Sequence, residues 1–299
     1  MIRIGNAPCS WGVLEFDLPS ANPPASQVLD EMAAAGYAGT ELGDWGFLPT
    51  ESRALADAIG RRGLTLAGAF VPVALARADA FADGVERAVR TARLLADAEF
   101  RDALIVLSDD NAVVPHRAAN AGRITPEHGL SSCEWDGFAS RASAIAAAVR
   151  DETQLRTVFH HHCGGYVETP HEIDALMART DPSLVGLCLD TGHLVFGRGD
   201  PLAAIARYGA RIWHVHVKDC APDVAARARA ERWDYHTAVG HGIFCELGRG
   251  MVPFANVCDA LRCENFSGWI IVEQDVLPGT GSPAASAARN REFLRRLGL

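Results

Sequence analysis

The 299-residue sequence predicts an α/β protein built as a single (β/α)8 TIM barrel. Short apolar runs rich in strand-forming residues alternate with segments of 3.6-residue periodicity from one end of the chain to the other. Eight such strand and helix units are present, and no break in composition separates them. We therefore expect residues 1–299 to form one domain, because a chain of this length is compatible with one large core.

The eight expected strands are short and apolar, as in a buried parallel sheet. They are residues 2–7, 38–42, 64–70, 102–107, 155–160, 184–190, 211–217 and 268–274. A doubly wound open sheet is the alternative architecture. It is disfavoured because residues 7–13 (APCSWGV) lack the glycine-rich phosphate loop that such a sheet usually carries after its first strand.

The helices between these strands carry recognisable end signals. Gly36 should stop the first helix, since glycine is favoured just past a helix end. Residues 131–134 and 169–172 have the pattern of capping boxes, in which side chains satisfy free backbone N–H groups. Asp-Pro at 200–201 and Ser-Pro at 282–283 should open two further helices.

Two connections are longer than the others, at about 108–131 and 218–250. In a barrel, both would leave the carboxyl ends of strands, where active sites of this fold are built. We therefore expect these insertions to act as lids, and the second contains several glycines that favour mobility.

Composition and charge exclude several classes of protein. Apolar residues make up 48% and charged residues 22%, and the net charge is −9. No apolar run reaches the roughly 18 residues that a membrane span needs, and the first residues lack a signal core. The acidic balance argues against nucleic acid. We expect a cytoplasmic protein with a small-molecule partner, whose eight cysteines stay reduced.

Residues with metal-ligand chemistry gather where the later strands should finish. These residues are His160, His161 and His162 in the fifth strand and its end, Asp190 and His193 around the end of the sixth, His214, His216 and Lys218 at the seventh, and Glu273 at the eighth. Strand alternation places His160 and His162 on one face, and His214 and His216 likewise share a face.

Imidazole and carboxylate groups together suit Mn²⁺, Co²⁺, Fe²⁺ or Zn²⁺. A single histidine in a strand is more often a hydrogen-bonded core residue, and Asp190 before Thr-Gly has a cap as its alternative role. Four consecutive strands that each end in a ligand-type residue favour a shared metal site instead.

Seven stretches carry a resemblance to a known superfamily. They are IRIGNAPCSWG (2–12), EMAAAGYAGTELG (31–43), RGLTLAGAF (62–70), FHHHCGGYVETPHEID (159–174), GLCLDTGHL (186–194), HVHVKD (214–219) and GWIIVEQD (268–275). The chain resembles the xylose-isomerase-like TIM-barrel superfamily of sugar isomerases, epimerases and dehydratases. Within it, the resemblance is closest to the inosose dehydratase family.

The resemblance implies one divalent metal at the ends of strands five to eight, with Glu, Asp, His and Glu as the usual ligands. Asp190, His216 and Glu273 match the last three. The first position departs from the pattern. Spacing favours His160 there, and Glu168 from the following loop is the alternative. The family implies Mn²⁺ or Co²⁺, with Zn²⁺ or Fe²⁺ allowed, and a homodimer or homotetramer.

The implied activity is dehydration of a keto-cyclitol through an enediolate that the metal stabilises. The alternative is a metal-dependent isomerase or epimerase acting on a free ketose, which shares the first proton transfer and needs the same ligands. A barrel that only binds a ligand is a third hypothesis, which the retained ligand residues disfavour.

Residues that we expect to transfer protons are His162, His193, Glu41 and Glu273. Residues that we expect to contact substrate are Asn6, Trp11, Lys218, His241 and Arg249. The alternatives are a buried ion pair for Glu41, a core position for Trp11 and a salt bridge for Lys218.

Overall fold

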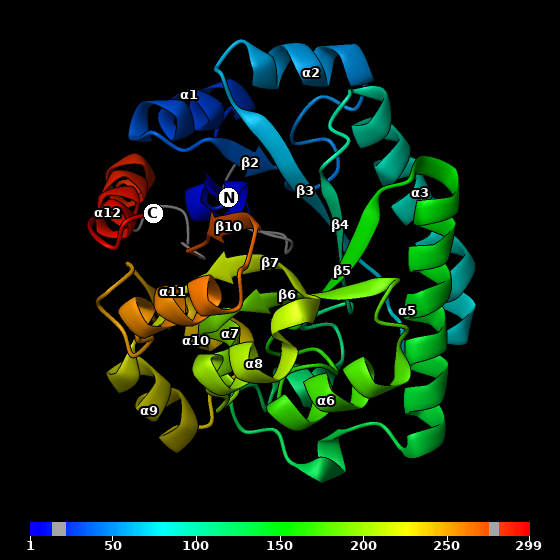
Figure 1. Ribbon diagram of the computed structural model, residues 1–299. Coiled ribbons are helices and arrows are strands. Elements are labelled where there is room, and N and C mark those ends of the chain that lie inside the picture. Colours follow the sequence, from blue (N-terminus) through cyan, green and yellow to red (C-terminus); the bar gives the residue numbers. More distant parts are fainter. Residues whose placement is uncertain (14–21, 275–280) are drawn as a thin grey trace.

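The computed structural model describes residues 1–13, 22–274 and 281–299, so Asp275 of the eighth strand-end segment lies outside the described residues. Within these ranges, eight parallel strands close into a barrel in the order β1-β10-β7-β6-β5-β4-β3-β2 (Figure 1). The expected (β/α)8 barrel is therefore confirmed. An open sheet is excluded, because β1 pairs with both β2 and β10.

The barrel strands start and end within two residues of the predicted positions. They are β1 (Ile2–Asn6), β2 (Gly39–Glu41), β3 (Thr65–Pro72), β4 (Leu104–Ser108), β5 (Arg156–His160), β6 (Val185–Asp190), β7 (Ile212–Val217) and β10 (Gly268–Val272). Periodicity located them well because parallel strands buried on both faces are continuous apolar runs.

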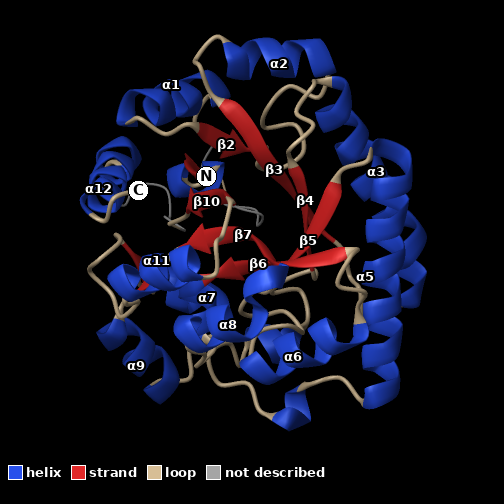
Figure 2. Cartoon of the chain, viewed as in Figure 1, coloured by secondary structure: helices blue, strands red, loops and turns tan. Residues whose placement is uncertain are grey.

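Helices surround the barrel on its outside (Figure 2). The longer ones are α1 (Ala25–Ala35), α2 (Ser52–Gly60), α3 (Phe81–Asp97), α5 (Ser132–Thr153), α6 (Pro170–Arg179), α8 (Pro201–Tyr208), α11 (Phe254–Cys263) and α12 (Pro283–Arg296). Gly36 ends α1 with a φ of +84°, and the two predicted capping boxes are present at α5 and α6. Within the described part of the chain, none of the helices has the length and apolarity needed to cross a bilayer.

The barrel interior is apolar in its lower part and polar at the carboxyl ends of the strands. Apolar side chains of β4, β5 and β6, such as Leu104, Val106 and Val158, fill the part below the strand ends. Trp269 and Ile271 of β10 form a separate cluster with Ala7 and Ala67. The polar residues lie above this plug, at the carboxyl ends of the strands, which is where barrels of this kind place their sites.

The insertion at 108–131 contains the short helix α4 (Pro115–Ala118), whose Arg117 is completely buried. The Arg117 guanidinium donates to the carbonyl of Gly165 at 2.7 Å and forms a two-pronged ion pair with Glu172 of α6. Paired charges of this kind fix both orientation and distance. The insertion is thus anchored to the loop that follows β5.

The insertion at 218–250 folds into a small subdomain that the periodicity did not reveal. It contains β8 (Asp219–Cys220), α9 (Pro222–Ala230), α10 (Tyr235–Gly240) and β9 (Phe244–Cys245), with β8 and β9 paired antiparallel. The Asp219 carboxylate accepts N–H groups from Cys220, Gly248, Gly250 and Val252 at 2.8–3.1 Å. Movement of either insertion as a lid stays a prediction.

Removal of Glu172 should destabilise the protein strongly. Glu172→Ala leaves the Arg117 charge buried without its partner, and we expect the free energy of unfolding to fall by about 3–5 kcal/mol in urea titrations. Glu152→Ala is the control, because the Arg93–Glu152 pair is about half exposed and should cost less than about 1 kcal/mol. Equal losses in the two variants would contradict the anchoring role of Arg117.

Candidate metal centre

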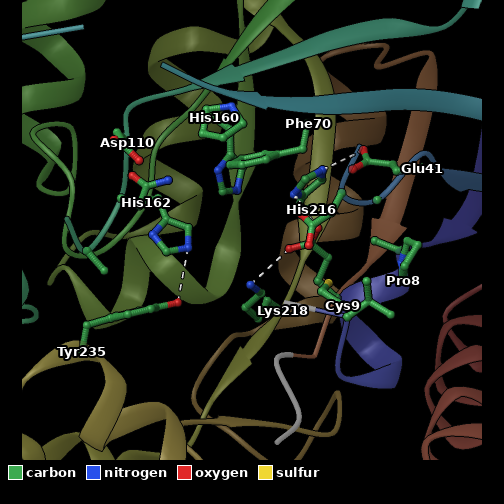
Figure 3. Close-up of a pocket in the computed structure, with 18 of the residues that line it drawn as sticks. Pro8, Cys9, Glu41, Phe70, Asp110, His160, His162, His216, Lys218 and Tyr235 are labelled. Atoms are coloured by element: carbon green, nitrogen blue, oxygen red, sulfur yellow. Dashed lines mark hydrogen bonds and ion pairs between the residues drawn. The ribbon is translucent and has the colours of Figure 1, made fainter. Parts of the chain in front are cut away.

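A cavity of about 250 Å³ opens at the carboxyl end of the barrel (Figure 3). Its size lies near the lower end of the roughly 300–1,000 Å³ usual for small-molecule pockets, so it suits a compact ligand. The charged, imidazole and phenol side chains in its lining are Glu41, Asp44, Asp110, His160, His162, His216, Lys218, Tyr235, His236 and Glu273. Most of them come from strand ends, as predicted.

Four of the predicted ligands meet at the floor of this cavity. His160, Asp190, His216 and Glu273 each offer one ligand atom, and these atoms all lie within 4.8 Å of one another. All four side chains are buried. Two imidazoles and two carboxylates form a donor set suited to Mn²⁺, Co²⁺, Fe²⁺ or Zn²⁺.

Several donor atoms of this cluster lack hydrogen bonds within the described residues. They are Nδ1 and Nε2 of His160, Oδ2 of Asp190 and Nδ1 of His216. Buried polar atoms are nearly always satisfied, so unsatisfied ones need a reason. A cation among them would provide that reason, and the residues present therefore fit a metal.

Asp190 caps a helix with one oxygen and faces the cluster with the other. Its Oδ1 accepts the backbone N–H of His193 at 2.8 Å and so caps α7 (Thr191–Phe196). Its Oδ2 faces the Nε2 atom of His160 at 3.5 Å. The cap fixes the carboxylate so that the second oxygen points into the cluster.

Positive groups near the cluster stabilise the ionised forms of its carboxylates. Burial raises the pKa of Glu273, but the charges of His216 and Lys218 lower it more, so that the pKa lies well below its usual value. Burial likewise raises the pKa of Asp190, and Lys218 and His160 reverse the effect. Both carboxylates are therefore ionised, as a metal ligand requires.

Glu168 is occupied elsewhere. Its Oε1 accepts the N–H of Gly122 at 2.7 Å, and its Oε2 accepts the N–H of Gly164 at 2.8 Å. Burial raises the pKa of this carboxyl to about 7. It joins the first insertion to the loop after β5 and is absent from the cluster, so the geometry favours His160 as the ligand from strand five.

Lys218 lies beside the two carboxylates of the cluster. Its Nζ is 3.1 Å from Oε2 of Glu273, 3.8 Å from Oδ2 of Asp190 and 3.1 Å from Nε2 of His193. The side chain is almost fully buried, yet it lines the cavity. It thus combines a salt bridge with access to a bound ligand.

His162 also faces the cavity. Its Nδ1 donates to the carbonyl of Cys163 at 2.7 Å, which leaves Nε2 as an acceptor, and the Tyr235 hydroxyl donates to it at 3.3 Å (Figure 3). Burial and the neighbouring His160 and Lys218 keep the pKa of His162 well below its usual value. The imidazole is therefore neutral and able to accept a proton.

Two other residues predicted to transfer protons, His193 and Glu41, are less accessible to a ligand than His162. His193 lies behind the cavity lining, with its ring centroid 3.8 Å from that of His162. Glu41 lines the cavity but is hydrogen-bonded to His214 and His216. Burial raises the pKa of Glu41, and the two imidazoles lower it more strongly, to below its usual range.

Four residues expected to contact substrate lie outside the lining. Asn6 and Trp11 are buried behind it, and the Trp11 indole donates to Glu31 at 2.6 Å. His241 stacks on Trp233, with centroids 4.1 Å apart. Arg249 is 70% exposed and pairs with Glu246. Contact of these four residues with a substrate stays a prediction.

Sequence reasoning missed several residues of the cavity wall. Asp110 belongs to the first insertion and Tyr235 belongs to the second, so both insertions reach the cavity. Phe70 of β3 packs edge-on against His160, with centroids 5.9 Å apart. The length of the insertions was the available signal, but no periodicity indicated which of their residues turn inward.

Residues 29–297 match the family described as Xylose isomerase-like TIM barrel. A protein of Geobacillus kaustophilus named Inosose dehydratase is 33% identical over 99% of this chain and 94% of its own length. The Rhizopine catabolism protein MocC of Rhizobium meliloti is 34% identical over 99% of this chain and 88% of its own length.

Solved structures share the fold at low sequence identity. The 3-keto-D-glucoside 4-epimerase YcjR of E. coli has a TM-score of 0.69 and 15% identity, covering 99% of this chain and all of that one. The probable 3-DHS dehydratase AsbF of Bacillus anthracis has a TM-score of 0.70 and 12% identity, covering 98% of each chain. These likenesses establish the fold alone.

Loss of one ligand from the cluster should weaken metal binding. We expect His160→Ala to lower Mn²⁺ affinity at least 10-fold, measured by competition with a chromogenic chelator, because it removes one of four convergent donors. Glu168→Gln is the matched control and should bind Mn²⁺ like the wild type. The opposite ranking would assign the strand-five ligand to Glu168.

Proposed function

Because the chain belongs to the xylose isomerase-like TIM barrel family, we propose that it is a divalent-metal-dependent dehydratase that removes water from a keto-cyclitol. The observation that carries this proposal is the cluster of four ligand-type residues beside Lys218, at the floor of a compact cavity. Relatives named Inosose dehydratase that match nearly the whole chain support the choice of reaction.

His160, Asp190, His216 and Glu273 would hold the metal, with Mn²⁺ or Co²⁺ favoured and Zn²⁺ or Fe²⁺ compatible with the same donors. Bound there, a divalent cation supplies Lewis acidity that acidifies the carbon next to a ketone. With two neutral imidazoles and two carboxylates, the occupied site is formally neutral, which preserves that acidity better than three carboxylates would.

His162 is the base in this proposal. The Cys163 carbonyl holds the proton of the ring on Nδ1, and Nε2 accepts the Tyr235 hydroxyl, which lines the same cavity. Nε2 becomes available to a substrate when that hydroxyl turns to the bound ligand. The imidazole takes the proton from the carbon next to the ketone, and the electron pair of that C–H bond moves toward the carbonyl. His193 packs against the ring and keeps it in this orientation.

Lys218 is the acid. Its Nζ reaches the cavity floor between Glu273 and His193. As the electron pair returns to form the carbon–carbon double bond, the C–O bond to the β-hydroxyl breaks. The Lys218 ammonium gives that oxygen a proton, so that it leaves as water. His162 holds the proton gained and Lys218 has lost one, which balances the reaction.

The charges of the cavity favour an uncharged polyol. Glu41, Asp44, Asp110 and Glu273 contribute carboxylates to the described lining, whereas Lys218 is the only lysine or arginine in it. Such a lining repels a phosphate group and offers acceptors to hydroxyl groups. A free keto-cyclitol fits this pattern better than a sugar phosphate.

Proton NMR in D₂O tests the proposal directly. Metal-free protein is loaded with Zn²⁺, which leaves spectra sharp, and parallel Mn²⁺ and Co²⁺ reactions are stripped with chelator before measurement. We expect metal-dependent loss of water from an inosose. Deuterium uptake with a rearranged but hydrated product would overturn the proposal in favour of an isomerase or epimerase. No turnover of inososes or free ketoses by metal-loaded protein would indicate a binding barrel.

Lys218→Met should separate catalysis from metal binding. The substitution keeps an apolar stem of similar length and removes the acid, so we expect kcat to fall about 10²–10⁴-fold. Metal affinity should stay equal or rise, because the removed cation lies 3.1 Å from Glu273 and repels a metal at the same carboxylates. A loss of metal affinity that accounts for the loss of rate would contradict the assigned role.

A further inference from the structure

The two ring nitrogens of His216 face two different carboxylates. Nδ1 lies 3.2 Å from Oε1 of Glu273, within the cluster of candidate ligands. Nε2 lies 3.0 Å from Oε1 of Glu41, on the other side of the ring (Figure 3). The ring therefore presents Nδ1 to the metal position and Nε2 to Glu41.

Glu41 is itself held in place by a second histidine. Nε2 of His214 lies 2.7 Å from the same Oε1 atom of Glu41, and His214 is fully buried. Glu41 is 3% exposed, so the three side chains form a nearly dry group at the cavity wall, to which Glu41 and His216 contribute. Both Nε2 atoms lie at hydrogen-bonding distance from one carboxylate oxygen, which is an acceptor, so both imidazoles donate their Nε2–H to it.

The backbone directs Glu41 to this position. The pairing of β2 with β3 shifts register between Thr40 and Glu41, an irregularity that commonly redirects a side chain next to a site. Glu41 pairs with Gly68, where an added Cβ would lie 3.0 Å from the carbonyl oxygen of Leu104 and 3.6 Å from Oε1 of Glu41. A Cβ at Gly68 would press on the Leu104 carbonyl and would meet the carboxylate at ordinary contact distance.

We propose that Glu41 is a positioning residue that holds His216 with its proton on Nε2, so that Nδ1 is the nitrogen that binds the metal. The inference rests on the metal site of the proposed function. Histidines that bind metals generally donate their other N–H to such a partner, which fixes the tautomer and orients the ring. His214 is the second anchor that keeps the Glu41 carboxylate beneath His216.

This role replaces proton transfer from substrate as the function of Glu41. Two N–H groups already converge on its Oε1 atom. A carboxylate stabilised in this way is a weaker base than a free one. His162 lines the cavity and its Nε2 accepts one hydrogen bond, from the Tyr235 hydroxyl, so it is better placed for that step.

Metal affinity tests the proposal without reference to turnover. Mn²⁺ affinity is measured by chelator competition for the wild type, Glu41→Ala, Glu41→Gln and Asp44→Asn. We expect Glu41→Ala to weaken binding about 10–100-fold. Glu41→Gln should weaken it less, because the amide oxygen still accepts from His216. Asp44→Asn removes a cavity carboxylate that does not contact His216, so it reports the effect of charge alone.

Two comparisons distinguish a positioning role of Glu41 from an effect of charge and from proton transfer. Equal losses in Glu41→Ala and Asp44→Asn would overturn the positioning role, since the effect would then be one of charge. At saturating Mn²⁺, Glu41→Gln should recover most of the wild-type rate. Normal metal affinity with a rate that excess metal does not restore would identify Glu41 as a proton-transfer residue instead.

The tautomer of His216 provides a spectroscopic check. Two-bond ¹H–¹⁵N spectra of the Zn²⁺-loaded, ¹⁵N-histidine-labelled protein should show His216 protonated at Nε2 and bound to metal through Nδ1. Binding through Nε2 would overturn the inference. Failure of the wild type to bind any divalent metal would defeat the proposed function itself, whereas normal binding with an unaffected Glu41→Ala variant would defeat only this inference.

Discussion

Three buried carboxylates at one end of the barrel, those of Glu41, Asp190 and Glu273, impose the main constraint on this structure. An ionised carboxylate removed from water is costly unless other charges and donors compensate it. Here Lys218 and the imidazoles of His160, His214 and His216 provide that compensation. His160 lies on β5, whereas His214, His216 and Lys218 lie on or directly after β7. Closure of the barrel brings these groups to the carboxylates at the ends of β2, β6 and β10.

The same constraint fixes the side chains in and beside the cluster. Several of them have a partner that sets their orientation. Asp190 uses one oxygen as a helix cap, Lys218 is supported by Glu273, and His162 is held by Cys163. Side chains oriented before a substrate arrives need not be reorganised during the reaction, which is a general source of catalytic power.

Much of this arrangement could be predicted from the sequence. The eight strands follow from apolar runs, and the convergence of His160, Asp190, His216 and Glu273 follows because parallel strand ends meet at one mouth. The partner of His216 could not be predicted, because Glu41 lies 175 positions away and a register shift decides where it points. Tyr235 was missed because it lies on a short helix in an insertion without a periodic pattern.

The hydrogen bonds of Asp219 fix both ends of the second insertion at one residue. One carboxylate gathers backbone amides from both the beginning and the end of the segment, at Cys220 and at Gly248 to Val252. The segment is therefore a loop whose two ends are both hydrogen-bonded to the residue that follows Lys218. Its interior packs on Ala121, Cys163 and Phe196, so the segment is attached to the barrel at its middle as well as at its two ends. A substitution at either place would therefore disturb the part of the cavity wall that Tyr235 provides.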